Sequence, residues 1–379
     1  MRMVSIRNLE SGCVLAKPIL GSDGRILLQS GVVLTSGYIR RLQLMNFNYV
    51  YIQDSDTYDI QIEETISLEV QQEVVSRIKN IYDSLADPKG NQQLIDSGKL
   101  GREFTNIFKT LFQSLMSDHS FIVNLSAIYT SDAYLYTHCM NVGTMASVLG
   151  MAAGFNNDRV FKFGLGAMLH DIGKIKVNQG ILNKPGKFTE EERAEIEKHC
   201  ELGYEMLIKQ PDIPSVSAHC ALQHHEKFDG TGYPRKLRGS EIHEFGRILA
   251  IPDVYDALTS NRVYRPAMLP HEAVEYLFAQ SGSHFDPEFV RLFLNHINIY
   301  PNGTPVQLSN GLYGVVARAN SHNLQRPVIL ALNDNGHKIT PYELDLSQEL
   351  HITIVGRNTE EAPPSAINAH GLGDEMNLA

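Results

Sequence analysis

Residues 156–174 read NNDRVFKFGLGAMLHDIGK, and this stretch decides the expected fold. Asn156 is a suitable N-cap and an acidic residue follows in the first turn, which predicts a helix. His170 and Lys174 share one stripe of that helix, and Asp171 lies beside them. Burying an imidazole, a carboxylate and an ammonium together is costly unless a metal or an anion joins them. A lone His-Asp dipeptide is common by chance, so the neighbouring segments carry the argument.

Helical patterns on both sides of this stretch bring in further histidines. Residues 134–150, YLYTHCMNVGTMASVLG, put His138 on the inward face of a predicted helix. Downstream, Thr189 and Glu192 form a capping-box pattern that begins another helix, with His199 on its inward face. Taken singly, each fits a hydrogen-bonded core histidine.

Two later segments add ligand types that suit a metal. Residues 217–234, SAHCALQHHEKFDGTGYP, place His224 and His225 at a helix end before a glycine-rich loop. Residues 247–265, RILAIPDVYDALTSNRVYR, put Asp253 and a second carboxylate on one helix face, with a kink expected at the preceding proline.

Together these segments predict a binuclear metal site. Imidazole and carboxylate ligands favour Fe or Mn, with Zn as an alternative, over Ca or Mg. Two divalent ions and two carboxylates leave a local positive charge that attracts a phosphodiester, and such a pair generates a hydroxide nucleophile. The alternative to metal binding is that each of these buried histidines and aspartates has its own hydrogen-bond partner, which would require many buried polar contacts. The candidate ligands are His138, His170, Asp171, His199, His224, His225 and Asp253, with Asp171 as the bridge.

Composition limits the remaining function classes. The 379 residues carry 33 Lys and Arg against 43 Asp and Glu, a net charge of -10, which opposes binding to a nucleic-acid polymer or an acidic membrane surface. The sequence has no apolar run of about 18 residues and no signal-peptide pattern, so we expect a cytoplasmic chain without membrane insertion. Its four cysteines are too few for a disulfide scaffold.

These motifs, in this order, resemble the HD-GYP domain, the branch of the HD superfamily whose members hydrolyse cyclic di-GMP. The resemblance rests on the following residues: His170-Asp171, Lys174, His199, His224-His225 and Asp229-Gly230-Thr231-Gly232-Tyr233-Pro234. It implies a mainly α fold, a helical HD-domain bundle with a small β-rich module before it and a small β appendage after it.

The resemblance also implies roles for individual residues. One metal is expected on His138, His170, Asp171 and Asp253, and the second on Asp171, His199, His224 and His225. Asp171 and Lys174 are the implied catalytic residues, with Lys174 contacting the scissile phosphate. Residues that support the ligands or orient the substrate are Asp132 and Asp256. Residues expected to contact the dinucleotide are Tyr233, Arg262, Tyr264 and Arg265.

Three positions depart from the family pattern. Tyr134 stands where some members have a carboxylate that holds a third metal, so we expect two metals. Residues 261–265 read NRVYR where DRPYR is expected, and Pro252 precedes the ligand Asp253 where a small residue is usual. The ligands stay intact, while substrate affinity is open.

We expect five segments: a β-rich module at 1–54, a helical connector at 55–118, the HD-GYP catalytic domain at 119–298, a β appendage at 299–357 and a disordered tail at 358–379. The expected activity is hydrolysis of cyclic di-GMP to linear pGpG, and on to GMP as a further step, through a binuclear metal-hydroxide.

Two alternatives remain. Instead of a cyclic di-GMP phosphodiesterase, the chain could act as a cyclic-dinucleotide receptor or interaction protein with weak turnover. The second alternative is an HD hydrolase of another nucleotide. We also consider a homodimer through the helices of 62–118, and a protein partner on the N-terminal module.

Overall fold

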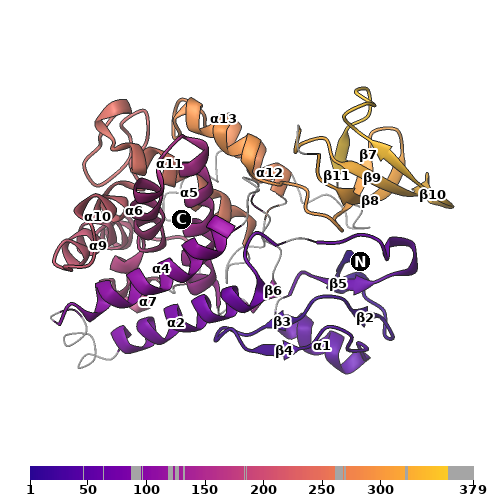
Figure 1. Ribbon diagram of the computed structural model, residues 1–379, viewed down its shortest axis with the longest axis horizontal. Coiled ribbons are helices and arrows are strands. Elements are labelled where there is room, and N and C mark those ends of the chain that lie inside the picture. The colour runs from indigo at the N-terminus through magenta and orange to yellow at the C-terminus, as the bar shows by residue number, and fades with distance from the viewer. Residues whose placement is uncertain are drawn as a thin grey trace.

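Helices occupy the middle of the chain, and small sheets lie before and after them, as Figure 1 shows in the computed structural model. The predicted mainly α fold is confirmed. The structure describes residues 1–45, 47–62, 64–86, 95, 97–117, 123, 128–130, 133–182, 184, 186–260, 268, 270–320 and 323–356. The predicted tail at 358–379 lies outside them.

The α-helices run in chain order as follows: α1 (Ser36–Leu44), α2 (Leu68–Ala86), α4 (Lys99–Ser117), α5 (Tyr134–Ala152), α6 (Asn157–Met168), α7 (Gln179–Leu182), α8 (Glu190–Glu197), α9 (His199–Leu207), α10 (Ser215–Gln223), α11 (Glu244–Thr259), α12 (Pro270–Ala279) and α13 (Pro287–His296). Short 3-10 helices are η1 (Ile6–Asn8), η2 (Ser55–Thr57), η4 (Ile172–Lys176) and η5 (Gly239–Glu241).

The strands form three sheets. The N-terminal module has β1 (Arg2–Ser5), β2 (Val14–Leu15), β3 (Ile19–Leu20), β4 (Ile26–Leu28) and β5 (Tyr49–Gln53). One sheet has the order β1-β5-β2, and the other has the order β4-β3-β6, where β6 (Ile128–Tyr129) comes from the segment just before α5. Because β6 pairs with β3 in parallel, the N-terminal module is joined directly to the chain that enters α5.

The C-terminal sheet has five strands in the order β10-β9-β8-β7-β11. They are β7 (Pro305–Leu308), β8 (Leu312–Arg318), β9 (Val328–Asp334), β10 (His337–Asp345) and β11 (Ile354–Gly356). Asn335 and Gly336 both have positive φ between β9 and β10, the backbone that a tight hairpin requires. The sequence predicted no separate strand at β10, because Pro341 interrupts the strand pattern of residues 337–345. The chain accommodates this proline at an edge strand whose register shifts between Lys338 and Tyr342.

Two closely packed helices, α5 and α6, bring the first predicted ligands together. Helix α6 begins as predicted, with the Asn156 side chain accepting a hydrogen bond from the Arg159 N–H. Gly164 allows the close approach, because a Cβ there would lie 2.2 Å from Ser147 Oγ of α5. This packing sets the C-terminal end of α6 against the N-terminal half of α5.

The predicted connector helices belong to the main core. Helix α2 packs on α4 and α5, and α4 packs on α6 (Figure 1). Their apolar faces, represented by Ile78 and Phe104, are fully buried in the same cluster as α5 and α6. The homodimer through the helices of 62–118 was considered because of their exposed periodicity, and it stays a hypothesis; the apolar faces of α2 and α4 pack against the chain's own helices.

No helix among the described residues is both long enough and apolar enough to cross a membrane.

Candidate metal centre

The seven predicted ligands converge in the helical core. They come from α5, the turn between α6 and η4, the start of α9, the residues that follow α10, and the middle of α11. Every one of these side chains is at least nine-tenths buried: His138, His170, Asp171, His199, His224, His225 and Asp253. Helical spacing predicted inward positions for His138, His170, His199 and Asp253, and a helix end for His224 and His225, and the structure brings all seven side chains to one place.

Four of the imidazoles are oriented by an oxygen that accepts from their outer nitrogen, Nδ1. Such an acceptor requires a hydrogen on Nδ1, so in the neutral form of each ring the lone pair is on Nε2. The pairs and their N···O distances are His138 with Asp256 Oδ2 at 2.7 Å, His170 with Ala167 O at 2.7 Å, His199 with Ile196 O at 2.7 Å, and His224 with Cys220 O at 3.0 Å.

The free lone pairs face one another in two couples. His138 Nε2 lies 3.3 Å from His170 Nε2, and His199 Nε2 lies 3.2 Å from His224 Nε2. Two lone pairs at this separation repel unless a cation lies between them. Metal–nitrogen bonds of about 2.0–2.1 Å at angles between 90° and tetrahedral put two ligand nitrogens about 2.9–3.4 Å apart. Both couples therefore have the spacing of metal ligands.

Asp171 lies between the two couples, with one oxygen toward each. Its Oδ2 is 3.4 Å from His170 Nε2, and its Oδ1 is 3.5 Å from His199 Nε2. Within the described part of the chain, Asp171 Oδ1 and both carboxylate oxygens of Asp253 are buried without a hydrogen-bond partner. Buried carboxylate oxygens in that state fit a site built for cations.

The electrostatics of the metal-free site differ between the two couples. Burial disfavours a charged His170, but the carboxylates of Asp171 and Asp253 outweigh this and raise its pKa to about 10. Burial and the charge of Lys174 lower the pKa of His199 to about 3. A divalent ion at the first couple would therefore displace a proton, so metal affinity there should fall as pH falls.

The prediction that His170 and Lys174 share one helix was wrong, because α6 ends at Met168 and Lys174 lies in η4, but Lys174 still reaches Asp171. Its Nζ lies 2.7 Å from Asp171 Oδ2, and its side chain is 12% exposed. The ammonium thus reaches the Asp171 carboxylate while its side chain keeps some contact with solvent.

The remaining predicted residues divide into two groups. Asp256 hydrogen-bonds His138 and also accepts from Asn141 Nδ2 at 2.8 Å. The Tyr233 ring packs beside the His225 ring, with centroids 4.7 Å apart. Four predicted residues lie outside the described part of the chain: Asp132, Arg262, Tyr264 and Arg265.

A second local prediction was also wrong. A single helix from Thr189 was expected to carry His199, and its capping box is present. In the structure α8 ends at Glu197 and α9 begins at His199. His199 nevertheless faces the site, because the start of α9 packs on η4 at Gly173.

Three side chains at the site were not singled out from sequence. Asn141 follows His138 by three residues and holds Asp256, so its helical spacing was an available signal. The Cys200 sulfur lies 3.6 Å from His199 Nε2. Glu226 is buried, and its two oxygens accept from the backbone N–H groups of Arg235 and Leu237 at 2.8 and 2.9 Å. Nothing in the residue pattern distinguished Cys200 or Glu226 from ordinary core and loop positions.

Replacing Glu226 with Gln should weaken the loop that carries Tyr233. An amide has one oxygen, so its NH2 group would face one of the two backbone N–H donors in a buried place. We expect the free energy of unfolding to fall by about 2 kcal/mol, while metal content stays unchanged because Glu226 is not a ligand. Denaturant unfolding and elemental analysis measure the two quantities. The exposed Glu190→Gln serves as the control, and equal stability of both variants would contradict the prediction.

His284 supports the same loop and should make stability depend on pH. Its carbonyl accepts from the Phe228 N–H, and burial, then the charge of Lys227, lowers its pKa to about 3. The unfolded chain therefore binds the proton first as pH falls below about 6.5, so this stabilisation is present above that pH and lost as pH falls toward 3.

In His284→Gln, the metal-free protein should lose stability less steeply between pH 6.5 and 5, by up to about 1.4 kcal/mol for each pH unit. Urea unfolding of both proteins at pH 7.5 and pH 5 checks this. Parallel losses in the two proteins would show that His284 does not titrate in this range.

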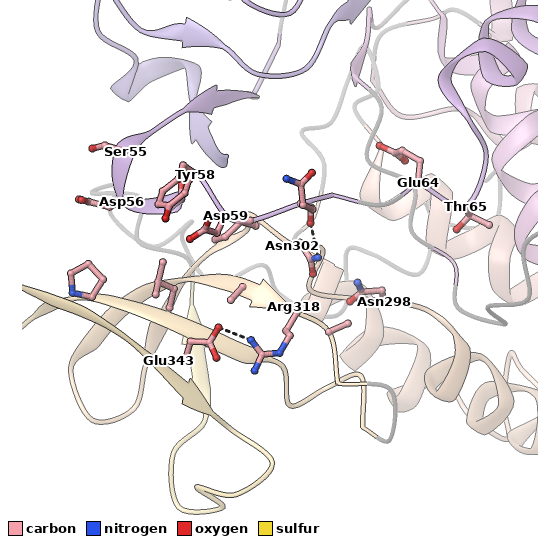
Figure 2. Close-up of a pocket in the computed structure, with 17 residues that line it drawn as sticks. Ser55, Asp56, Tyr58, Asp59, Glu64, Thr65, Asn298, Asn302, Arg318 and Glu343 are labelled. Atoms are coloured by element: carbon pink, nitrogen blue, oxygen red, sulfur yellow. Dashed lines mark hydrogen bonds and ion pairs between the residues drawn. The ribbon is translucent and has the colours of Figure 1, made fainter.

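A separate groove of about 980 Å³ lies between residues 55–65 and the C-terminal sheet (Figure 2). Of the described site residues, none lines it. Figure 2 shows the side chains of Arg318 and Glu343 pointing at each other. Their ion pair joins Arg318 Nη1 to Glu343 Oε1 at 2.5 Å, and a second ion pair joins Lys338 Nζ to Asp56 Oδ2 at 2.7 Å. These acidic walls give no reason to place a phosphodiester there.

The helical region is similar in sequence to proteins of known family. Residues 111–289 match the model of the HD domain. A cyclic di-GMP phosphodiesterase of Pseudomonas aeruginosa is 36% identical over 214 residues, covering 56% of this chain and 51% of that protein. A cyclic di-GMP phosphodiesterase of Thermotoga maritima is 31% identical over 232 residues, covering 61% of this chain and 62% of that protein.

A third relative acts on a different cyclic dinucleotide. The 3'3'-cGAMP-specific phosphodiesterase 2 of Vibrio cholerae is 44% identical over 129 residues, covering 34% of this chain and 25% of that protein. In each case this chain spans less than two thirds of the relative's length. The family match and these relatives confirm the resemblance that the motifs predicted. Residues 111–289 of this chain are therefore similar to the HD domain family.

Proposed function

We propose that this chain is a metal-dependent phosphodiesterase that hydrolyses cyclic di-GMP to linear pGpG, with cleavage to GMP as a further step. The observation that carries the proposal is the pair of imidazole couples, at 3.3 and 3.2 Å, on the two sides of the Asp171 carboxylate. The relatives named as cyclic di-GMP phosphodiesterases support the substrate.

The donor set fits two divalent transition-metal ions, Fe or Mn first and Zn as the alternative. His138, His170 and Asp253 would hold one ion, His199, His224 and His225 the other, and Asp171 would bridge them. When bound, such a pair activates water at neutral pH and neutralises charge on a phosphate oxygen.

The chain's own residues then have distinct tasks. Lys174, 2.7 Å from Asp171 Oδ2, would turn its ammonium toward the phosphate once metal charge neutralises that carboxylate. Asp256 would keep His138 in the tautomer that presents Nε2, and Asn141 fixes the orientation of Asp256. Tyr233, packed on His225, offers its ring as a wall for a guanine base.

The competing substrate is 3'3'-cGAMP, which the Vibrio cholerae relative's name specifies. Both cyclic dinucleotides present the same phosphodiester to the metals and differ in one base, so the metal site itself does not discriminate between them. The residues expected to contact the bases include 262–265, which lie outside the described residues.

The test is turnover of cyclic di-GMP by protein loaded anaerobically with Fe²⁺ or Mn²⁺, with products separated by chromatography and 3'3'-cGAMP assayed in parallel. Metal-dependent cleavage with a higher kcat/KM for cyclic di-GMP would support the proposal. A higher kcat/KM for 3'3'-cGAMP would reassign the substrate. Protein that holds two metals and binds cyclic di-GMP without cleaving it would instead be a receptor.

A further inference from the structure

We propose that Cys200 is an additional ligand of the second metal, so that this ion is held by a thiolate as well as by His199, His224, His225 and the bridging carboxylate. The inference rests on the metal-dependent function proposed above and concerns only its second ion. It assigns a sulfur ligand to a site otherwise made of imidazoles and a carboxylate.

The geometry carries this assignment. Cys200 is the second residue of α9 and is fully buried. The ligand atoms of Cys200, His199, His224 and His225 all lie within 4.8 Å of one another. The Cys200 Sγ is 3.6 Å from His199 Nε2. A metal at about 2.1 Å from nitrogen and about 2.3 Å from sulfur sets these atoms about 3.1 Å apart at an angle of about 90° and about 3.6 Å apart at about 110°, so the observed separation lies within the range of two ligands of one ion.

A hydrogen bond from the thiol to His199 is the alternative explanation of this contact. It is compatible with the metal-free site, because His199 donates through Nδ1 to the Ile196 carbonyl and keeps Nε2 as an acceptor. A metal on Nε2 uses the same lone pair. Once the ion binds, the buried thiol loses that acceptor, and ligation with release of its proton to solvent gives the sulfur a new partner.

A second observation points to a ligand at this position. His225 is 5% exposed, and its Nε2 has no hydrogen-bond partner among the described residues. The Asp171 Oδ1 that faces the same couple is also buried without one. The Cys200 sulfur therefore belongs to a cluster that includes His225 Nε2 and Asp171 Oδ1. Both of these atoms are buried without a hydrogen-bond partner among the described residues, and a bound cation would satisfy them.

Position next to a ligand histidine does not by itself bring a sulfur into the site. Cys139 follows His138 just as Cys200 follows His199, and it is equally buried. Its Sγ turns away and lies 3.7 Å from the Tyr82 hydroxyl. Cys139 is thus a matched control within the same chain.

A thiolate changes what the second site prefers. Sulfur is a softer donor than imidazole or carboxylate, so Cys200 should favour Zn²⁺, Co²⁺ or Fe²⁺ over Mn²⁺ at this position. It also lowers the charge of the loaded site by one, which weakens attraction of the phosphate but strengthens retention of the ion. Cys200→Ala should shift the Zn²⁺ over Mn²⁺ affinity ratio at this site at least about tenfold toward Mn²⁺.

The experiment loads the full-length protein with Co²⁺ and records its absorption spectrum beside its metal content. Wild type and Cys139→Ala should show a near-ultraviolet sulfur-to-cobalt charge-transfer band at two Co²⁺ per chain, and Cys200→Ala should lose that band while still binding Co²⁺. X-ray absorption of the Zn²⁺-loaded wild type should show a sulfur neighbour at about 2.3 Å, a measurement that needs no variant to fold.

Two bound ions with only nitrogen and oxygen neighbours, and no charge-transfer band in wild type, would overturn the assignment of Cys200 while leaving the phosphodiesterase proposal standing. If the metal has a sulfur neighbour but the protein cleaves no cyclic dinucleotide, the assignment of Cys200 as a ligand would stand and the phosphodiesterase proposal would fail. If Cys200→Ala is insoluble, Cys200→Ser keeps the side-chain size and should also lack the band.

Discussion

Asp171→Asn is expected to remove most of the bound metal and to lower hydrolysis of cyclic di-GMP more than about 100-fold, since even residues that only hydrogen-bond a metal ligand are worth about 10–100-fold. The two oxygens of Asp171 face different imidazole couples, His138 with His170 and His199 with His224. Asparagine carries no charge and replaces one oxygen with an NH2 group, so it cannot bridge two cations.

Metal content per chain and the rate of pGpG formation measure this effect. Asp158→Asn is the control, because that carboxylate is 72% exposed and pairs only with the surface residue Lys162. It should retain both metals and full activity. If Asp171→Asn kept two tightly bound ions, the bridging arrangement would be wrong, even if activity had fallen.

Gly173→Ala should disrupt the second half of the site although it replaces no ligand residue. A Cβ at this position would lie 2.0 Å from the His199 carbonyl oxygen and 2.6 Å from the Gly203 N. Both atoms are backbone of α9, so the helix start that carries His199 must move away from η4. Because overpacking of this kind costs about 3 kcal/mol, we expect a fall of that order in the free energy of unfolding.

The same variant should bind one divalent ion tightly and the other weakly, because His138, His170 and Asp253 do not lie on α9. Calorimetric titration with Mn²⁺ and denaturant unfolding provide the two measurements. Gly37→Ala is a suitable control, since its nearest atom would be Thr35 Oγ1 at 3.7 Å, an ordinary contact. Unchanged stability and two equal tight sites in Gly173→Ala would contradict the prediction.

The sequence was most informative where structure is local. The short spacing of His170, Asp171 and Lys174 predicted that their side chains meet, and Lys174 reaches Asp171 even though α6 ends at Met168 and Lys174 lies in η4. The Asn156 cap and the Thr189 capping box were predicted from side chains that bond within one turn, and both are present. Such contacts depend on few residues and short loops, so periodicity and capping patterns predict them.

The sequence was less informative where packing between distant segments decides the outcome. The periodicity of residues 62–118 did not reveal what these helices pack against, and in the structure the apolar faces of α2 and α4 pack on α5 and α6. The break between α8 and α9 was also missed, because the close approach of α9 to Gly173 is a contact between segments.

By itself, the sequence determined which residues are ligand types and that His138, His199 and Asp253 lie on inward helix faces, because those facts follow from the period of a helix and the cost of burying unpaired charge. Only the tertiary structure decided how they are grouped, with His138 beside His170, His199 beside His224, and one oxygen of Asp171 toward each couple. It also decided that the sulfur of Cys200, and not that of Cys139, lies at the site. Adjacent positions on a helix point about 100° apart, so only the packing of helices distant in sequence determines which of them faces a metal.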